Sequence, residues 1–381
     1  MRVLILGARA PACLEWARAF HSAGAYVIAA DSLQWPLTRF SSAVSHYVCL
    51  PEPKSNLQAW VDALRHTIRT ERIDRVIPTC EEAFYLAHVR DALPCQVMIS
   101  DFALMRSLHH KGEFAAMTQG WPIQAPATHV LESPKDLTTF TTPEHWVFKP
   151  AYSRFAHQTL IRPSRQAITH LQPSPETPWV AQAFIEGREY CSFSVLDHGR
   201  LIAHACYQPR YRVGRGSGIW FDPAQPADIR AFIEHFGRTT GYTGQVGFDF
   251  IQDTQGQFHV LECNPRATSG IHLFDRQGQA LVTALTAMAP VLTPDDTPRQ
   301  VALAMVVFGI GKYGLSRQFW HDLTHARDVI TRKNDTGPLW AQLPGLLEII
   351  GRALSRRCSL LAAATADCEW NGQPLAPVVC N

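Results

Sequence analysis

The sequence has no strong excess of charge of either sign. Its 381 residues carry 35 Lys and Arg against 33 Asp and Glu, which gives a formal net charge of +2, and charged residues make up 18% of the chain. Proteins that bind nucleic acid usually carry a clear basic excess, so this balance argues against that class. Apolar residues make up 46%, as in an ordinary globular protein, and the length is sufficient for two or three domains.

Long hydrophobic runs are also missing. No stretch of about 18 uncharged apolar residues occurs, so we expect no transmembrane helix. The chain passes directly into the apolar segment Val3–Leu6, without the basic segment, apolar segment and cleavage site of a secretory leader. We therefore expect a cytoplasmic protein.

Paired cysteines are a third absence. The ten cysteines are scattered, with no C-x-x-C pair and no compact cluster with histidine. This spacing argues against a zinc motif and against a disulfide framework, and it predicts buried thiols in a reducing compartment. The 17 histidines show no metal-binding spacing either, and we interpret His109-His110 as a solvated helix turn rather than as a pair of metal ligands.

Residues 1–100 alternate between predicted strands and predicted helices. Strands are expected at Val3–Leu6, Tyr26–Ala30 and Arg75–Pro78, and helices at Cys13–Ala23 and Leu57–Arg69. Repeated β-α-β units predict a parallel sheet with helices on both faces, and they place ligands at the carboxyl ends of the strands.

Dinucleotide binding is the first hypothesis that such a sheet raises. The turn after the first strand reads Gly7-Ala-Arg-Ala-Pro11 rather than G-x-G-x-x-G, so the second and third glycines that admit a pyrophosphate are missing. Asp31 at the end of the second strand fits a ribose-binding acid, but it fits an ordinary turn equally well. An NAD-dependent oxidoreductase is therefore disfavoured.

The rest of the chain contains further elements of both kinds. The patterns predict a helix at Phe102–Thr118, a small α/β unit at 127–185, β-rich segments at Gly187–Ala205 and Gly244–Cys263, a strand at Val301–Phe308 and an amphipathic helix over Leu339–Leu361.

The most informative segment is Gly244–Arg266, which reads as two strands joined by a tight turn at Asp253–Gly256. If that turn pairs its first and last residues, Asp249 lies opposite Val260, and alternation puts Glu262 on the same face as Asp249. The opposite face then carries apolar side chains, with His259 as the one polar exception: Val246, Phe248, Phe250, Leu261 and Cys263.

Asp249, Glu262 and Asn264 share the polar face of this predicted hairpin. Two clustered carboxylates repel each other unless a cation or a proton lies between them. Hard oxygen ligands of this kind suit Mg²⁺ bound to substrate phosphates. The alternative is a solvated sheet face with ordinary surface acids, but Asn264-Pro-Arg266 adds a cation at the same strand end. We predict a metal site at these three residues.

Two lysines are candidates for binding phosphate. Lys149 ends the apolar segment Trp146–Pro150, and a lysine with a buried stem needs a counter-anion, for which a phosphate is suitable. Alone, it would equally well reach solvent. Lys111 opens a helical stretch and by itself reads as a surface lysine.

The segment 179–195 reads as a strand, a turn at Gly187 and a second strand. A strand that breaks at a turn leaves backbone groups that can bind the edge of an adenine. Glu189, just past the turn, could accept hydrogen bonds from ribose hydroxyls. A plain hairpin is the alternative.

Residues 207–218 form a loop with three arginines (Arg210, Arg212 and Arg215), three glycines and Ser217. Arginines in such a loop could clamp a substrate carboxylate. A basic surface loop or a nucleic-acid contact is the alternative. The segment Thr79-Cys80-Glu81-Glu82, at the end of a predicted strand, is a further candidate for the same cleft.

These segments, in this order, resemble the ATP-grasp superfamily over about residues 104–275, and residues 1–100 resemble the preceding domain of its carboxylate-amine ligase and carbamoyl-phosphate-synthetase-like members. The strongest match is the strand pair that carries Asp249, Glu262, Asn264 and Arg266. Next come Val-Phe-Lys149-Pro and the hinge that ends at Gly187-Arg-Glu189. Lys111 and Gly120–Pro126 match more loosely. The resemblance implies an α/β protein with a Rossmann-like parallel-sheet domain at 1–103. A two-lobed α+β core would follow at 104–290, with a lid near 127–185, and then a C-terminal strand plus helical extension at 291–381.

The resemblance also implies roles for individual residues. Lys111 and Lys149 would hold the phosphates of ATP, the hinge residues Gln182, Ala183, Phe184 and Ile185 would meet adenine, and Glu189 would bind ribose. Asp249, Glu262 and Asn264 would hold Mg²⁺ (or Mn²⁺), Arg266 and Lys149 would act on the transferring phosphoryl group, and Arg210, Arg212, Arg215 and Ser217 would face the substrate.

Two positions depart from the family pattern. Members usually have a glycine-rich loop after the lysine-proline step, but residues 151–158 contain no glycine, so Ser153, Arg154 and His157 would have to take part. Members often have Glu at the hinge, where this chain has Gln182.

The implied activity is an ATP-dependent ligase. It would activate a carboxylate as an acyl phosphate and transfer it to a nucleophile, an amine by preference, with release of ADP and phosphate. The expected partners are small-molecule carboxylates and amines, with no nucleic acid, and a homodimer is considered. The competing hypotheses are a non-catalytic nucleotide-binding or regulatory module, which has no need of two metal acids, and the disfavoured NAD-dependent oxidoreductase.

Overall fold

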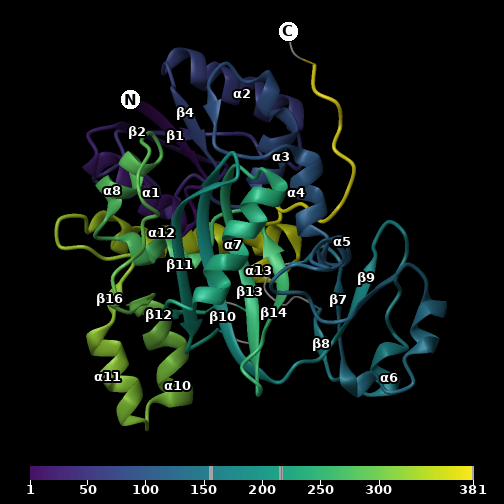
Figure 1. Ribbon diagram of the computed structural model, residues 1–381. Coiled ribbons are helices and arrows are strands. Elements are labelled where there is room, and N and C mark those ends of the chain that lie inside the picture. The colour runs from purple at the N-terminus through teal and green to yellow at the C-terminus, as the bar shows by residue number, and fades with distance from the viewer. Residues whose placement is uncertain (154–157, 214–215, 217, 380–381) are drawn as a thin grey trace.

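The computed structural model describes residues 1–153, 158–213, 216 and 218–379 (Figure 1). Its N-terminal part contains a five-stranded parallel sheet in the order β3-β2-β1-β4-β5. The strands are β1 (Arg2–Leu6), β2 (Tyr26–Asp31), β3 (His46–Cys49), β4 (Arg75–Ile77) and β5 (Gln96–Val97). The parallel sheet expected from the β-α-β pattern is confirmed.

Helices cover both faces of this sheet. They are α1 (Pro11–Ser22), α2 (Leu57–Thr70), α3 (Glu82–Val89) and α4 (Phe102–His109). Alternate residues of β1 enter different cores: Val3 packs in the core that contains Trp16 of α1, and Leu4 packs in the core that contains Trp60 of α2. A strand buried on both faces is expected to read as a continuous apolar run, as β1 does.

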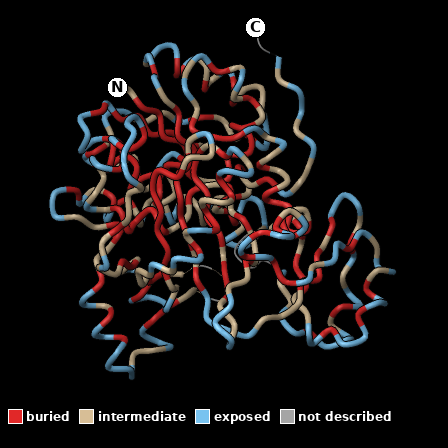
Figure 2. The backbone as a smooth tube through the Cα atoms, viewed as in Figure 1, coloured by how far each residue is buried: buried red, intermediate tan, exposed pale blue. Residues whose placement is uncertain are grey.

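A seven-stranded sheet forms the centre of the molecule, in the order β14-β13-β10-β11-β12-β15-β16. Its strands are β10 (Gly187–Asp197), β11 (Arg200–Pro209), β12 (Trp220–Ala224), β13 (Gly244–Asp253), β14 (Phe258–Asn264), β15 (Arg299–Gln300) and β16 (Arg327–Asp328). One face packs with α1 and with α8 (Gly278–Ala284), and the other packs with α7 (Ala227–Thr240). Figure 2 shows that the buried residues are concentrated in this sheet and in the N-terminal sheet.

A separate lobe contains a four-stranded antiparallel sheet in the order β6-β9-β7-β8 (Figure 1). Its strands are β6 (Thr128–Leu131), β7 (Trp146–Pro150), β8 (Leu160–Ile161) and β9 (Trp179–Ala183), with the short helix α6 (Arg165–Ile168). Its small core includes Leu131, Phe140 and Phe148. Because β9 and β10 belong to different sheets, the segment 179–195 is a connection between lobes and not a plain hairpin.

The segment Val301–Phe308, predicted as a strand, is helical instead. The strand β15 ends at Gln300, directly before this segment. The chain then continues as α9 (Ala302–Ala304), a π-helical turn at Met305–Gly309 and α10 (Ile310–Tyr313). The backbone N–H of Ala302 donates to Asp328 Oδ1 at 3.0 Å, which caps the first turn. The segment Ala302–Met305 consists of strong helix formers, whereas the three valines and the phenylalanine around it favour a strand, so the apolar run alone does not decide between the two.

The remaining helices return the chain to the N-terminal sheet. They are α11 (Arg317–His325), α12 (Gly337–Arg356) and α13 (Leu360–Ala363), so the amphipathic helix expected over Leu339–Leu361 is confirmed except for a break after Arg356. Beyond α13, Trp370 stacks on Phe84 of α3 with ring centroids 5.0 Å apart. In Figure 1 the final segment runs alongside α2 and α3. None of the helices in the described ranges is long and apolar enough to cross a membrane.

Candidate functional site

A cavity of about 370 Å³ lies between the four-stranded lobe and the seven-stranded sheet. Its lining comes from both sheets and from α5 (Lys111–Met117). The predicted site residues that line it are Lys111, Lys149, Gln182, Ala183, Phe184, Ile185, Glu189, Arg212, Asp249, Glu262, Asn264 and Arg266. Predicted phosphate, adenine, ribose, metal and substrate positions therefore border one space.

Asp249 lies directly opposite Glu262 in the ladder between β13 and β14. The predicted register, with Asp249 opposite Val260, is wrong. The strands turn one residue later than expected, and a bulge after Asp249 adds a second shift. Two shifts of one residue preserve the face that each side chain takes, because side chains alternate with a period of two. The bulge buries Val260 in the core and turns Leu261, expected in the core, toward the cavity.

The two carboxylates are electrostatically unequal. Burial and the charge of Glu262 raise the pKa of Asp249 to about 7. Burial opposes ionisation of Glu262 too, but Lys111 and Lys149 outweigh it and lower the pKa of Glu262 to about 2. Asn264 Nδ2 donates to Asp249 Oδ2 at 3.4 Å, so an amide completes the set. Two carboxylates and an amide on one face are donors that fit Mg²⁺.

The two lysines approach the same carboxylate. Lys111 Nζ lies 3.4 Å from Glu262 Oε2, and Lys149 Nζ lies 3.9 Å from it. Both side chains are at most 10% exposed. Burial lowers the pKa of Lys149 to about 8. Two buried cations share one carboxylate, so the cavity has positive charge available for a further anion.

Lys111 owes its place to a break in the helix predicted over Phe102–Thr118. The structure has two helices there, α4 and α5, separated at His110. The His110 ring Nδ1 accepts the backbone N–H of Glu113 at 3.1 Å and so begins α5. The Lys111 N–H donates to Ala151 O at 3.1 Å, and Lys111 Nζ donates to Ser153 O at 3.0 Å. These bonds join Lys111 to the segment that follows Lys149.

Arg266 is held by the N-terminal part of the chain. Its Nε donates to Glu81 Oε1 at 2.7 Å, and Glu81 is 1% exposed. Arg266 Nη2 also donates to Asn264 Oδ1 at 3.2 Å. The segment Thr79–Glu82 thus reaches the site through Glu81. Sequence spacing named this segment but gave no partner for it, because Glu81 and Arg266 are 185 residues apart.

The hinge residues are partly engaged within their own lobe. Gln182 Oε1 accepts from Lys149 Nζ at 3.1 Å, and its amide nitrogen donates to Thr128 Oγ1 at 3.2 Å. A glutamine can accept and donate at once, whereas an ionised glutamate only accepts. The N–H groups of Ala183 and Phe184 donate to Ala127 O and His145 O, which holds the hinge in place.

The arginine loop divides between two environments. Arg212 pairs with Glu189, and both line the cavity. Arg210 is not among the lining residues; it bonds Asp322 at 2.8 Å and Asp222 at 2.9 Å. The structure therefore does not bring Arg210 into the site, since two acids of the same chain already bind it. Arg154, His157, Arg215 and Ser217 lie outside the described residues.

The sequence analysis missed Cys191 and Tyr207, which line the cavity beside Asp249. Cys191 pairs with Asp249 on one side and with Tyr207 on the other, so the three side chains form a row across β13, β10 and β11. Alternation from Glu189 along β10 would have placed Cys191 on the cavity face.

No protein-family model matches the chain, and no curated protein matches it. Solved structures do match. An L-amino acid ligase from Bacillus licheniformis has a TM-score of 0.59 at 16% identity and covers 75% of this chain and 74% of its own. An N5-carboxyaminoimidazole synthetase from Staphylococcus aureus, complexed with ADP, has a TM-score of 0.60 at 11% identity and covers 92% of this chain and 97% of its own.

A phosphoribosylamine–glycine ligase from Thermotoga maritima matches with a TM-score of 0.56 at 16% identity, over 78% of each chain. Identities this low establish architecture alone. The chain therefore has the same fold as these solved structures.

Proposed function

We propose that this protein is an ATP-dependent ligase that activates a substrate carboxylate as an acyl phosphate and transfers the acyl group to a nucleophile, an amine by preference. The observation that carries the proposal is the direct pairing of Asp249 with Glu262 in a cavity that also holds Lys111, Lys149 and Arg266. The matched ligases, one of them with bound ADP, support it.

The metal and phosphate contacts follow from the donor set. Asp249, Glu262 and Asn264 would hold Mg²⁺, or Mn²⁺ in its place, which supplies positive charge beside the phosphates. Lys111 and Lys149 now share Glu262, and a polyphosphate would give both ammonium groups a stronger partner.

The other end of the nucleotide would lie along the hinge. The N–H groups of Ala183 and Phe184 already hold the hinge in its lobe, so we assign the adenine contact to the backbone of Ile185, with Gln182 beside it. Glu189 would exchange its partner Arg212 for the ribose hydroxyls. That exchange would free Arg212 for an anionic substrate.

The chemistry needs no side-chain nucleophile. A carboxylate oxygen of the substrate attacks the γ-phosphorus of ATP, the bond to the β-phosphate oxygen breaks, and ADP leaves. Lys149 and Arg266 stabilise the negative charge on the phosphoryl oxygens during transfer. The amine then attacks the carbonyl carbon of the acyl phosphate, and phosphate leaves.

An assay of ADP release with pooled carboxylic acids and amines tests the proposal. We expect Mg²⁺-dependent formation of ADP and phosphate, lost in Glu262→Gln and retained in Glu234→Gln, a matched change on α7 outside the cavity. AMP and pyrophosphate as the main products would contradict the proposed mechanism. ATP binding without turnover under any pool would favour the regulatory-module hypothesis.

A further inference from the structure

A second cluster of reactive side chains lies outside this cavity, where the parallel sheet meets the C-terminal segment. Cys80 and Glu82 follow β4, and Cys368 follows α13. One sulfur from each cysteine and one carboxylate oxygen all lie within 4.8 Å of one another; Glu82 and Cys368 are buried, and Cys80 is partly buried. Sequence spacing excluded a zinc motif because Cys368 lies far along the chain from the other two. The fold brings the three together.

We propose that Cys80, Glu82 and Cys368 bind one Zn²⁺ ion, with a fourth position open to water. Thiolates favour zinc over Mg²⁺ or Ca²⁺, and a carboxylate is a common companion ligand. Metal–ligand bonds of about 2.0–2.3 Å put neighbouring ligand atoms of a tetrahedral site roughly 3.3–3.8 Å apart. Side-chain rotation within a cluster that spans 4.8 Å can reach this arrangement.

There is space for an ion beside the cluster. A small cavity of about 20 Å³ is bordered by Gly7, Glu82 and Cys368, among others. A water-sized guest needs roughly 10–15 Å³. Gly7 has φ of 77°, and a Cβ there would lie 2.9 Å from Glu82 Oε1 and 3.1 Å from Cys80 Cβ. The main chain after β1 approaches the cluster this closely because residue 7 is glycine.

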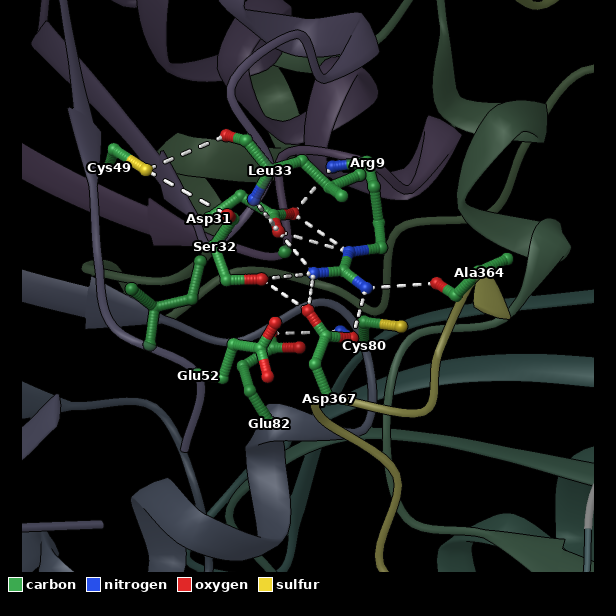
Figure 3. A network of polar contacts seen from close by, with 12 residues as sticks. Arg9, Asp31, Ser32, Leu33, Cys49, Glu52, Cys80, Glu82, Ala364 and Asp367 are labelled. Carbon is green, nitrogen blue, oxygen red and sulfur yellow. Dashed lines mark hydrogen bonds and ion pairs between the residues drawn. The ribbon is translucent and has the colours of Figure 1, made fainter. Parts of the chain in front are cut away.

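Contacts that do not involve the proposed ion already hold the ligand residues in place. Glu82 Oε1 accepts the backbone N–H groups of Thr79 and Cys80 at 2.9 and 3.0 Å, which leaves Oε2 as the candidate ligand atom. On the other side, Asp367 bonds Arg9 at 2.6 and 2.7 Å (Figure 3), which fixes the main chain next to Cys368. A preformed site binds without a large cost of ordering its ligands.

The charges are compatible with a divalent cation. Two thiolates balance the charge of Zn²⁺, and Glu82 would add one oxygen donor. The hydrogen bond with Cys80 and burial raise the pKa of the Cys368 thiol, although Arg9 opposes the rise. Zinc binding to the two cysteines as thiolates would release their protons.

The proposed ion would join two distant parts of the chain. It would tie the C-terminal segment to the turn that carries Glu81, the residue that holds Arg266. The proposal does not depend on ATP turnover, so it can fail or hold separately from the ligase assignment.

Metal titration of the full-length protein under reducing conditions tests the site. We expect one equivalent of Zn²⁺ to bind in competition with a chromophoric chelator. Co²⁺ in its place should give the near-ultraviolet band of thiolate-to-cobalt charge transfer. Cys80→Ser and Cys368→Ser should each lower the affinity at least about 100-fold and remove the band. Glu82→Gln should weaken binding and shift the cobalt spectrum without removing the band.

Two matched cysteine variants exclude other sources of the signal. Cys358→Ser changes a cysteine after α12 outside the cluster, and Cys191→Ser changes the cysteine beside Asp249; both should keep the band. Thermal melting of each variant shows whether it is folded. Failure of the wild-type protein to bind a stoichiometric ion would overturn the proposal. Binding that survives both Cys80→Ser and Cys368→Ser would overturn it too, as would a Cys80–Cys368 disulfide whose reduction gives no metal binding.

Discussion

Oppositely charged side chains form ion pairs in two regions of this molecule. One is the cavity, and the other is the contact between the C-terminal segment and the N-terminal part of the chain, which contains Arg9–Asp367 and Arg18–Asp335 and is called the seam below. In the cavity, Lys111 lies 3.4 Å from Glu262. In the seam, Arg9 lies 2.6 Å from Asp367 and Arg18 lies 2.8 Å from Asp335. All three pairs are largely buried, so burial and charge alone do not separate the two regions.

The difference lies in what else the charged groups contact. Arg9 donates to Asp31, Asp367, Ser32 and the carbonyl of Ala364, so its guanidinium is used by the protein itself (Figure 3). The cavity instead offers about 370 Å³ beside two lysines that share one carboxylate. Available volume next to incompletely matched charge therefore indicates a ligand site, whereas fully matched charge indicates a structural contact.

The sharpest test of this comparison is Glu262→Gln in the cavity. Removing the carboxylate charge eliminates a metal ligand and the partner of both lysines, but it removes no core packing. We expect turnover to fall at least about 1000-fold, equivalent to about 4 kcal/mol of transition-state stabilisation. The melting temperature should stay near that of the wild type. Near-normal turnover with Mg²⁺ would show that the metal assignment is wrong.

The matching change in the seam is Asp335→Asn. Asp335 accepts from Arg18 Nε at 2.8 Å, Ser41 Oγ at 2.7 Å and the N–H of Ser42 at 2.8 Å. Removing its charge leaves Arg18 buried without its ionic partner, which should lower the free energy of unfolding by about 3 kcal/mol. Turnover per folded molecule should be unchanged.

The effect of Asp335→Asn on the free energy of unfolding should depend on pH. Burial opposes ionisation of Asp335, but bonds from Ser41, Ser42 and Arg18 hold its pKa below the usual value. A carboxyl with a lowered folded-state pKa stabilises the protein fully above the unfolded pKa of about 4, and this contribution is lost as the pH falls further. Urea unfolding at pH 7 and pH 3 should show a large difference between wild type and Asp335→Asn that shrinks at pH 3. Asp62→Asn, an exposed change on α2, serves as control.

Glu81 joins the two regions, because it belongs to the N-terminal part and holds an arginine of the cavity. Glu81→Gln should leave Arg266 less firmly oriented and lower kcat about tenfold, near 1.4 kcal/mol, with little change in ATP affinity. In an Arg266→Ala background the same change should have almost no further effect on kcat. Additive losses in the double variant would mean that Glu81 does not act through Arg266.

The smallest effects are expected in the arginine loop. Arg212→Ala should raise the substrate KM about fivefold, near 1 kcal/mol, because Arg212 lines the cavity. Arg210→Ala should leave KM unchanged and lower stability by about 1 kcal/mol, because Arg210 binds Asp322 and Asp222 instead. An increase in KM for Arg210→Ala alone would place the substrate on the other side of the loop.

Prediction from the sequence succeeded where the alternation of side chains along one segment decides which face they occupy. Asp249 and Glu262 were placed on one face because alternation by two survives a register error of two residues. It failed where the period is ambiguous: Val301–Phe308 is a continuous apolar run, which fits a strand and a helix equally. The break at His110 was missed because a single histidine cap does not interrupt the apolar pattern.

Contacts between segments that lie far apart in the chain could not be predicted from the sequence. Nothing near Glu81 points to Arg266, and nothing near Cys80 points to Cys368, because both pairs depend on how the C-terminal and central parts fold onto the N-terminal sheet. Arg210 and Arg212 are two residues apart, yet only the folded loop shows that one enters the cavity and the other does not.

Calorimetric titration of the protein with ATP and with NAD, each with and without Mg²⁺, tests the central claim most directly, since it requires no knowledge of the substrate. We expect one equivalent of ATP to bind in the presence of Mg²⁺. Lys149→Ala should weaken that binding at least about tenfold, because a buried charge-assisted contact is lost, and NAD should not bind. ATP binding that is indifferent both to Mg²⁺ and to Lys149→Ala, or tight binding of NAD, would contradict the assignment of the cavity as a metal–ATP site.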